Sequence, residues 1–307
     1  MHDETTQSSD SGLNLPCVGA VVVTFHPEAS VEEHLRAVRP QVDVLVVVDN
    51  GSSASELEWM RRVCGELQAA LIENGENLGI ATALNVGVRA VIERGLPYVL
   101  LFDQDSCATP GFAQAMLTGF ERSPWGARLG ILVPRYMDRR LNFEIPPDRV
   151  SQGLEAAMTS GSLIRSKTFA DQGLFMDALF IDAVDYEFSL RLRQAGSIID
   201  QCDEAVLLHA PGEPVVHRFR GRRLFQTANY TPIRRYYQER NKIWVARRYF
   251  QSFPVFCAKL FLFSAKDFVK ILVAESGKWK KCRFFLRGVV DGLRGRMGRL
   301  ELPPPPR

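Results

Sequence analysis

Two carboxylates separated by one residue directly follow an apolar run. Residues 98–102 (YVLLF) are apolar, and Asp103 and Asp105 come next with Gln104 between them. Such a run is typical of a buried strand, and open α/β sheets bind ligands at the carboxyl ends of their strands. Alternate strand side chains face the same side, so the carboxylates repel each other unless a cation separates them. Mg²⁺ or Mn²⁺ held with phosphate fits this pair; the alternative is capping of the helix after residues 109–110.

Strand-like and helix-like segments alternate before residue 215. The strand-like segments are apolar and β-branched, and the helix-like segments carry apolar stripes. This alternation predicts an α/β fold, a mostly parallel sheet with right-handed crossovers and flanking helices. Residues 134–150 look irregular. Strands are expected at residues 18–25, 42–48, 70–73, 98–102, 129–133, 158–164 and 205–208, with helices at residues 30–39, 55–69 and 80–94 and another leading from residues 180–188 to Gly196.

Composition and charge divide the chain into two parts. With 307 residues, 46% of them hydrophobic, the chain holds one large domain with an appendage or two modest domains. Six scattered cysteines without a C-x-x-C pair indicate reduced thiols and argue against a disulfide framework or a zinc site. Residues 216–307 carry 22 Lys+Arg against 5 Asp+Glu, a net +17, which leaves −14 for the rest. Residues 1–16 and 302–307 are expected to be disordered tails, and residues 1–12 lack a signal-peptide pattern.

The basic region is rich in aromatic residues and predicted to be helical over residues 216–301. Residues 253–273 form a segment that is long and apolar enough to suggest a membrane-spanning helix. However, Lys259, Lys266 and Lys270 fall within about 40° of one another on a helical wheel. This pattern favours a helix lying in the plane of an anionic membrane surface; the alternative is a helix packed on the preceding domain with its lysines outward. No nucleic acid is expected as a partner, because the sequence shows no recognised nucleic-acid-binding motif. The other helical segments are residues 234–249 and 279–299.

Several motifs in the expected order carry a family resemblance. Four of them together resemble family 2 inverting glycosyltransferases of the GT-A fold, and two more are similar to bacterial rhamnosyltransferases that build cell-surface polysaccharides. The resemblance spans residues 18–299 and implies a GT-A catalytic domain over residues 17–215. The four motifs are residues 21–27 (VVVTFHP), 47–52 (VVDNGS), 73–79 (ENGENLG) and 101–106 (LFDQDS); the two others are 181–191 (IDAVDYEFSLR) and 235–241 (RYYQERN).

The resemblance implies a set of residues that bind a nucleotide sugar. Asp49 would accept a hydrogen bond from the imide N–H of uracil or thymine; its alternative role is to cap the next helix. Asn77 would contact the nucleotide, or serve as a plain N-cap. Gly79 would let the backbone approach closely. The complete implied donor set is Thr24, Phe25, Asp49, Asn77, Gly79, Asn85, Asp103 and Gln104.

The resemblance also implies metal ligands, and a glycine within a strand marks a candidate acceptor pocket. Asp105, with Asp103 and His209, would hold Mg²⁺ or Mn²⁺ against the donor diphosphate; a histidine after a strand can equally be structural. Ser160, Gly161 and Ser162 are assigned to the acceptor or sugar pocket, because glycine within a strand indicates close backbone approach.

A carboxylate must deprotonate the attacking hydroxyl, and alignment with the family places Asp185 in that role. Glu187 would be its acidic neighbour. The family's preceding acid is replaced by Val184, which leaves Asp182 or Glu187 as substitutes. The alternative reading is an acidic helix N-terminus favoured by the helix dipole.

These inferences describe one enzyme. It would transfer L-rhamnose from dTDP-β-L-rhamnose to a hydroxyl of a lipid-linked glycan, with inversion. It would be cytoplasmic and peripheral on the inner face of the bacterial cytoplasmic membrane. The alternatives are a UDP-hexose donor, or a noncatalytic protein that binds nucleotide or glycan. A dinucleotide oxidoreductase is disfavoured, because no G-x-G-x-x-G turn follows the first strand.

Overall fold

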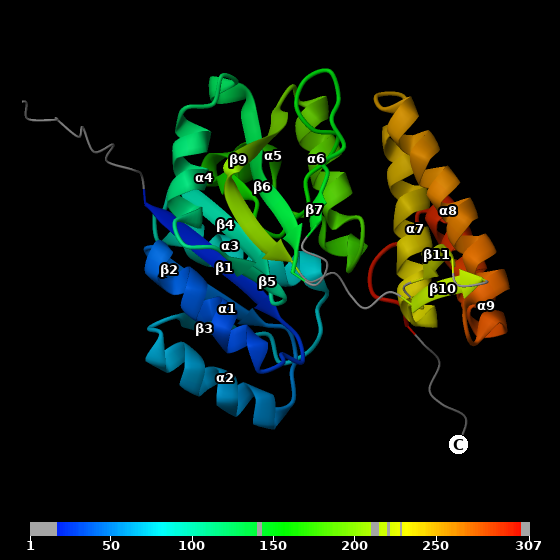
Figure 1. Ribbon diagram of the computed structural model, residues 1–307, viewed down its shortest axis with the longest axis horizontal. Coiled ribbons are helices and arrows are strands. Elements are labelled where there is room, and N and C mark those ends of the chain that lie inside the picture. The colour runs from blue at the N-terminus through cyan, green and yellow to red at the C-terminus, as the bar shows by residue number, and fades with distance from the viewer. Residues whose placement is uncertain (1–16, 140–142, 210–214, 220–221, 228, 302–307) are drawn as a thin grey trace, which may run out of the picture.

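The computed structural model describes residues 17–139, 143–209, 215–219, 222–227 and 229–301. The tails expected at residues 1–16 and 302–307 lie outside the described residues. Figure 1 shows two parts: a sheet flanked by helices, and a bundle of long helices beside it.

The described residues form one nine-stranded sheet in the order β3-β2-β1-β4-β8-β6-β9-β5, with β7 paired to β6. β1, β2, β3 and β4 are parallel, as the alternation predicted. β8 runs antiparallel to β4 and β6, and β5 antiparallel to β9. The strands are β1 (Val18–Thr24), β2 (Val44–Asp49), β3 (Ala70–Glu73), β4 (Tyr98–Asp103), β5 (Ser106–Ala108), β6 (Leu129–Asp138), β7 (Phe143–Ile145), β8 (Leu163–Arg165) and β9 (Ile198–His209).

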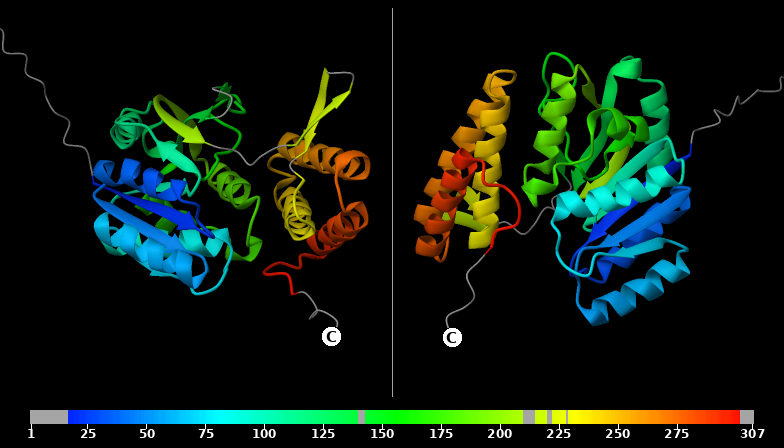
Figure 2. Two further views of the ribbon diagram at one scale, coloured as in Figure 1. Left: turned by 60° about the horizontal axis from the view of Figure 1, so that its bottom comes forward. Right: turned by 180° about the vertical axis from the view of Figure 1, so that it is seen from behind.

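Helices lie against this sheet (Figure 2), and the residues that they bury are mostly apolar. β1 is buried along its whole length. A Cβ at Gly87 would lie 2.2 Å from Val21 Cγ1, so glycine allows α3 to lie tightly against the central strand. The helices are α1 (Ser30–Val38), α2 (Ala54–Glu66), α3 (Ile80–Glu93), α4 (Phe112–Glu121), α5 (Ser166–Gln172) and α6 (Val184–Gln194), with 3₁₀ turns at Arg39–Gln41, Gly126–Arg128 and Asp177–Leu179.

Three expectations about the second half of the sheet were wrong in detail. The strand expected at residues 158–164 is reduced to β8, because a turn with Gly161 at φ +79° precedes it. The last strand, expected at residues 205–208, begins at Ile198 because it pairs along β6. The stretch expected to be irregular contains the end of β6 and all of β7.

The region expected to be purely helical begins with a hairpin of β10 (Val215–Phe219) and β11 (Arg222–Thr227). α7 (Pro232–Tyr249), α8 (Pro254–Ala274) and α9 (Lys278–Arg294) follow as a bundle. A Cβ at Gly288 would lie 2.4 Å from Tyr236 O, so α9 packs closely on α7. Among the described residues, no helix combines the length and apolarity that crossing a membrane requires.

Candidate active site

A cavity of about 310 Å³ lies beyond the carboxyl end of β4, between the sheet and the start of α7. It brings together Asp103 from β4, Asp185 from α6 and His209 from β9, which lie far apart in sequence. The three sequence-predicted residues therefore share one space. The other lining residues are Ile80, Leu84, Tyr136, Met158, Thr159, Ser160, Ile181, Asp182, Ala183, Val184 and Arg234.

A chain of hydrogen bonds fixes the floor of this cavity. Asp103 N donates to Ser160 Oγ at 3.0 Å, and Ser160 Oγ donates to Ser106 Oγ at 2.8 Å. Ser106 Oγ lies 3.0 Å from His209 Nδ1. This contact orients the imidazole and leaves Nε2 for a ligand.

Asp105 completes the acidic end of β4, although it is not a lining residue. Its Oδ1 lies 3.8 Å from His209 Nδ1. The same oxygen is buried and has no hydrogen-bond partner among the described residues. Burial, and then the charge of Asp105, raise the pKa of Asp103 to about 6. An unsatisfied buried oxygen beside a carboxylate that ionises reluctantly fits a cation-binding position.

These residues fit a hard divalent cation only if other ligands complete its shell. Within the described ranges, no group of three or more His, Cys, Asp or Glu side chains is positioned to hold a metal alone. Mg²⁺ and Mn²⁺ sites at phosphates commonly use one or two protein carboxylates and take the remaining oxygens from the phosphates.

Asp185 stands in the first turn of α6 after a strained loop. Phe180, Asp182 and Ala183 have φ values of 66°, 64° and 59°, which non-glycine residues rarely adopt. Tyr186 N donates to Asp185 Oδ1 at 2.8 Å. Burial raises the pKa of Asp185 to about 6; the Tyr186 N–H opposes this and Asp182 adds to it. Such a carboxyl is poised to exchange a proton near neutral pH.

Two side chains of α7 hold this strained loop in place. Asn241 Nδ2 donates to the carbonyls of Leu179, Ile181 and Asp182 at 2.9, 2.7 and 2.8 Å. Arg240 Nη2 donates to Leu179 O at 2.9 Å. Both side chains are buried. The R-N pair of the RYYQERN motif is therefore a structural clamp on the loop before Asp185, a role that sequence reasoning missed.

Glu187, predicted as the acidic neighbour of the base, faces away from the cavity. It is 4% exposed, and its carboxylate accepts from Arg191 at 3.0 and 2.9 Å. Tyr249 Oη also donates to it at 2.9 Å. On a helix, positions 185 and 187 point about 200° apart. The acidic neighbour that shares the cavity is Asp182, the other substitute that the sequence left open.

Arg234 is a cavity residue that sequence reasoning did not select. It lies in the first turn of α7, and its Nη2 is 3.4 Å from Asp182 Oδ1. Since the other charged lining residues are Asp103, Asp182 and Asp185, with His209 neutral or cationic, Arg234 supplies the permanent positive charge. The sequence alone did not single out Arg234, because this residue lies in a basic segment that contains many similar arginines.

Asp49 and Thr24 are fully buried at the ends of β2 and β1. Asp49 Oδ2 accepts from Gly51 N and Ser52 N at 3.0 and 2.9 Å, and Oδ1 faces Thr24 Oγ1 at 3.4 Å. Asp49 therefore shapes the loop after β2. It does not cap α2, because Ser53 forms the capping box there with Glu56. Recognition of a base by Asp49 stays a prediction.

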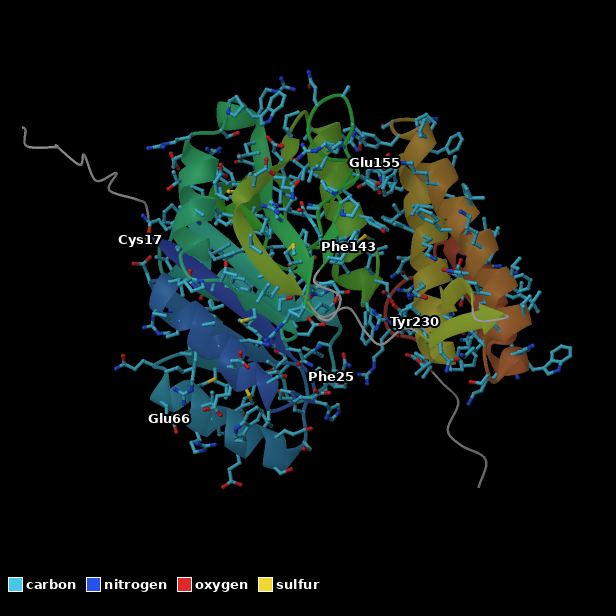
Figure 3. The ribbon with its side chains drawn as sticks, viewed as in Figure 1. Cys17, Phe25, Glu66, Phe143, Glu155 and Tyr230 are labelled. Carbon is cyan, nitrogen blue, oxygen red and sulfur yellow. The ribbon has the colours of Figure 1, made fainter. Side chains whose placement is uncertain are left out.

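The side chain of Gln104 binds the backbone of Phe25, the residue that follows β1. Its Oε1 accepts from Phe25 N at 2.9 Å, and its Nε2 donates to Phe25 O at 3.3 Å. The amide is thus engaged with the protein and holds Phe25, which is 40% exposed at the rim of the sheet (Figure 3). Phe25 is available to a ligand; Gln104 positions it.

Asn85, predicted to contact the nucleotide, does not face open space. It is 1% exposed; its Nδ2 donates to Phe175 O and Asp177 Oδ1, both at 2.8 Å, and its Oδ1 accepts from Phe175 N. Asn85 therefore anchors the segment before the strained loop, and the prediction of a nucleotide contact is wrong for this structure.

Asn77 and Gly79 build the turn that starts α3. Asn77 Oδ1 accepts from Gly79 N at 2.9 Å, while Gly79 itself is the N-cap residue. A Cβ at Gly79 would lie 2.5 Å from Phe180 O, so the close approach predicted there is to the strained loop. Direct nucleotide contact by Asn77 or Gly79 stays a prediction.

Of the three residues assigned to the acceptor pocket, only Ser160 lines the cavity. Gly161 is buried; a Cβ there would lie 2.7 Å from Pro134 Cγ, so its close approach is to the core. Ser162 is 1% exposed and donates to Met158 O at 2.6 Å. The assignment of Gly161 and Ser162 to this cavity is therefore wrong, because the turn before β8 directs them inward.

Comparison with solved structures identifies the fold class. The mannosyltransferase PcManGT from Pyrobaculum calidifontis, solved with GDP-Man and Mn²⁺, aligns over 92% of this chain and 88% of its own, with a TM-score of 0.58 and 16% identity. GalNAc-T7, solved with UDP, GalNAc and Mn²⁺, also gives 0.58 at 12% identity over 92% of this chain; the alignment spans only 57% of its length. S. aureus TarS 1-349, solved with UDP-GlcNAc, gives 0.52 at 14% identity over 91% of this chain and 73% of its own. These are GT-A glycosyltransferases, and the chain has their fold.

Sequence comparison narrows the class. Residues 20–161 match the family model "Glycosyl transferase family 2". The chain is 25% identical to dTDP-rhamnosyl transferase RfbF of Shigella flexneri over 297 residues, which is 91% of this chain and 96% of that protein. The protein is a glycosyltransferase of the GT-A fold, it is similar to family 2 over residues 20–161, and it resembles rhamnosyltransferases.

Proposed function

We propose that this enzyme transfers L-rhamnose, with inversion, from dTDP-β-L-rhamnose to a hydroxyl group of a glycan. The observation that carries the proposal is the single cavity in which Asp103 and His209 meet Asp185. Full-length similarity to a dTDP-rhamnosyl transferase supports this choice of donor.

Asp185 is the proposed general base. Its carboxylate would take the proton of the acceptor hydroxyl as that oxygen attacks the anomeric carbon. A single displacement assisted by one base inverts the anomeric centre. Asp182 lies in the same cavity and raises the pKa of Asp185, which makes the carboxylate a better proton acceptor.

Asp105, Asp103 and His209 would hold Mg²⁺ or Mn²⁺ at the donor diphosphate. When bound, the ion would neutralise the charge of the departing diphosphate. The similar structures of PcManGT and GalNAc-T7 were solved with Mn²⁺. Arg234 would contribute a second, fixed positive charge beside the same group.

Phe25 would lie against the nucleotide base at the rim of the sheet. Asp49, Asn77 and Gly79 would shape the adjoining turns. Gln104 acts through Phe25, and Ser160 would face the transferred sugar.

Donor competition tests this proposal. With Mn²⁺ present, the enzyme should release dTDP from dTDP-rhamnose faster than UDP from UDP-glucose or UDP-GlcNAc. A UDP-hexose donor is the second candidate, since the similar TarS structure was solved with UDP-GlcNAc. Faster release of UDP would replace the rhamnose assignment with that alternative.

We also propose that α8 and α9 lie on an anionic membrane, where a lipid-linked acceptor would be held. Val255, Leu262 and Val269 are exposed at intervals of seven residues on one face of α8. On α9, Trp279 is 91% exposed. A face of this kind is typical of helices that lie in the membrane interface.

The exposed charges of α8 and α9 are of the sign that an anionic membrane surface attracts. Their acidic residues Asp267, Glu275 and Asp291 are buried or partly buried and pair with basic residues, so the exposed charges are basic. Of the three lysines in the predicted stripe, Lys259 binds Glu155 at 2.6 Å while its side chain stays 44% exposed. We place the enzyme at the inner face of the bacterial cytoplasmic membrane.

Vesicle sedimentation tests this placement. The protein should bind phosphatidylglycerol vesicles at low salt, and Leu262→Glu should weaken binding about tenfold or more. Phe143→Glu, at a 60% exposed position on β7, is the control and should bind as the wild type does. A wild-type protein that ignores these vesicles at low salt contradicts the membrane proposal.

A further inference from the structure

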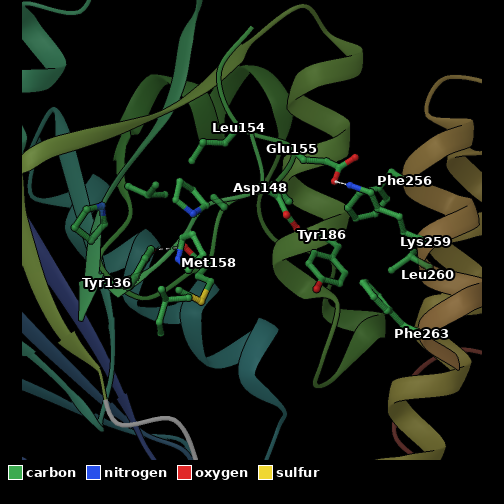
Figure 4. Close-up of a pocket in the computed structure, with 17 residues that line it drawn as sticks. Tyr136, Asp148, Leu154, Glu155, Met158, Tyr186, Phe256, Lys259, Leu260 and Phe263 are labelled. Carbon is green, nitrogen blue, oxygen red and sulfur yellow. Dashed lines mark hydrogen bonds and ion pairs between the residues drawn. The ribbon is translucent and has the colours of Figure 1, made fainter. Parts of the chain in front are cut away.

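A second cavity, of about 180 Å³, lies between the catalytic domain and α8. Its walls include Tyr186 of α6 on one side and Phe256, Leu260 and Phe263 of α8 on the other (Figure 4). The sequence motifs did not indicate this cavity, although Tyr186 belongs to one of them, because part of the wall comes from α8, which is distant in sequence.

This cavity adjoins the catalytic one. Tyr136 and Met158 line both cavities. Tyr186 directly follows Asp185 in the chain, and its ring meets that of Phe256 edge-on, with centroids 5.4 Å apart. The seam therefore shares two wall residues with the cavity that contains the proposed base.

The seam combines aromatic faces with polar groups. Phe256, Phe263 and Tyr186 offer apolar ring surface. Asp148 and the ion pair of Glu155 with Lys259 also line the seam (Figure 4). Burial, with Asp185 next, raises the pKa of Tyr186 to about 12, so its hydroxyl is neutral and can donate. That hydroxyl makes no hydrogen bond within the described part of the chain.

A sugar ring matches this chemistry. Its C–H faces pack on aromatic rings, while its hydroxyls need acceptors such as carboxylates and donors such as Tyr186. The cavity is smaller than the roughly 300–1,000 Å³ typical of drug-sized ligands, which favours a single ring. The lipid part of a glycan carrier would meet the exposed apolar face of α8, which is continuous with Phe263.

We propose that this seam binds the acceptor sugar and presents its hydroxyl to Asp185. The inference rests on the proposed transferase function and extends it: the C-terminal bundle completes the acceptor site, and a single pyranose ring of the glycan occupies it.

Saturation-transfer NMR on the full chain with dTDP and Mg²⁺, which is diamagnetic, tests the proposal. The probes are methyl α-L-rhamnopyranoside, methyl β-D-galactopyranoside and N-acetyl-D-glucosamine. At least one should bind the wild type. Ala156→Phe, which fills the seam, should abolish that signal, and Phe263→Ala should weaken binding about tenfold.

Phe261→Ala is the matched control. Phe261 and Phe263 are on the same helix and are 42% and 45% exposed, but only Phe263 lines the seam. The control should bind the probe within twofold of the wild type, and all variants should bind dTDP equally by calorimetry. No probe signal with the wild type, or an unchanged signal in Ala156→Phe and Phe263→Ala, would overturn the proposal. Failure of the donor assignment is separate: it would show as no dTDP release from dTDP-rhamnose.

Discussion

Acidic residues have opposite environments in the catalytic cavity and in the C-terminal bundle. Asp103 and Asp185 line the cavity, have no ion-pair partner among the described residues and have raised pKa values. In the bundle, Glu275 is completely buried but binds both Arg235 and Lys281. Burial alone therefore does not define a functional acid. A carboxylate that is buried without a cation is destabilising, and its retention indicates a ligand or a reaction.

The largest effect should come from the proposed base. Asp185→Asn should lower transfer about 10²- to 10⁴-fold, the usual contribution of a general base, because the amide cannot accept the proton. Binding of dTDP should be unchanged by calorimetry. Turnover at the wild-type rate would show that Asp185 is not the general base. It would also contradict the functional difference between Asp185 and the ion-paired acids of the bundle.

The bundle acid should affect folding instead of chemistry. Glu275→Gln should lower the free energy of unfolding by about 3–5 kcal/mol, because buried Lys281 would lose its carboxylate partner and buried Arg235 would keep only the longer contact with Asp267, at 3.6 Å. Urea denaturation measures this. Glu73→Gln is the control, since its pair with Arg61 is exposed and should contribute less than about 1 kcal/mol. Equal losses in both variants would contradict the assigned structural role.

The pH dependence of stability should further distinguish the acid in the catalytic cavity from the ion-paired acid in the bundle. Burial raises the pKa of Asp185 to about 6 from its ordinary value of 3.8, so the folded state holds this proton more tightly than the unfolded state does. Its contribution to stability is present below about pH 4 and is lost as the pH rises through 6, up to about 3 kcal/mol in all.

Two measurements test this predicted pH dependence of stability and activity. Asp185→Asn should be more stable than the wild type at pH 8, and the difference should disappear near pH 4. In the wild type, kcat/KM should fall about tenfold for each pH unit below 6, because the base becomes protonated. A stability difference that is constant with pH would show that Asp185 does not titrate as described.

The smallest effect should come from the clamp that joins the two regions. Asn241→Ala removes three hydrogen bonds to the loop carbonyls of Leu179, Ile181 and Asp182. Because the loop carries strained backbone, kcat should fall about tenfold as Asp185 loses its fixed position. The Kd for dTDP should change less than twofold. Arg248→Ala, an exposed position on the same helix, is the control; an equal fall in kcat there would argue against a specific clamp.

The family resemblance could be read from short stretches because strand ends are local features. Apolar runs predicted β1, β2 and β4, and each strand ends in a polar residue at the carboxyl edge of the sheet, of which Asp103 lines the cavity. The same alternation predicted the parallel order, which the structure confirms. Asp103, Asp185 and His209 were likewise found from motif context before any geometry was known.

Which side chain faces the cavity was decided by tertiary structure. Asp182 and Glu187 were equivalent candidates in the sequence, yet loop strain turns one inward while Arg191 and Tyr249 bind the other. Asn85 was misassigned because its partners lie 90 residues away.

The sequence by itself determined the sheet, the acidic strand end and the class of chemistry, because these depend on hydrophobic periodicity and on neighbouring residues. Tertiary structure alone decided that Arg234 enters the cavity, that Asn241 holds the strained loop and that α8 closes a second pocket beside Tyr186. The physical reason is that each of these contacts joins segments distant in sequence, and their position depends on how α7 and α8 pack against the catalytic domain.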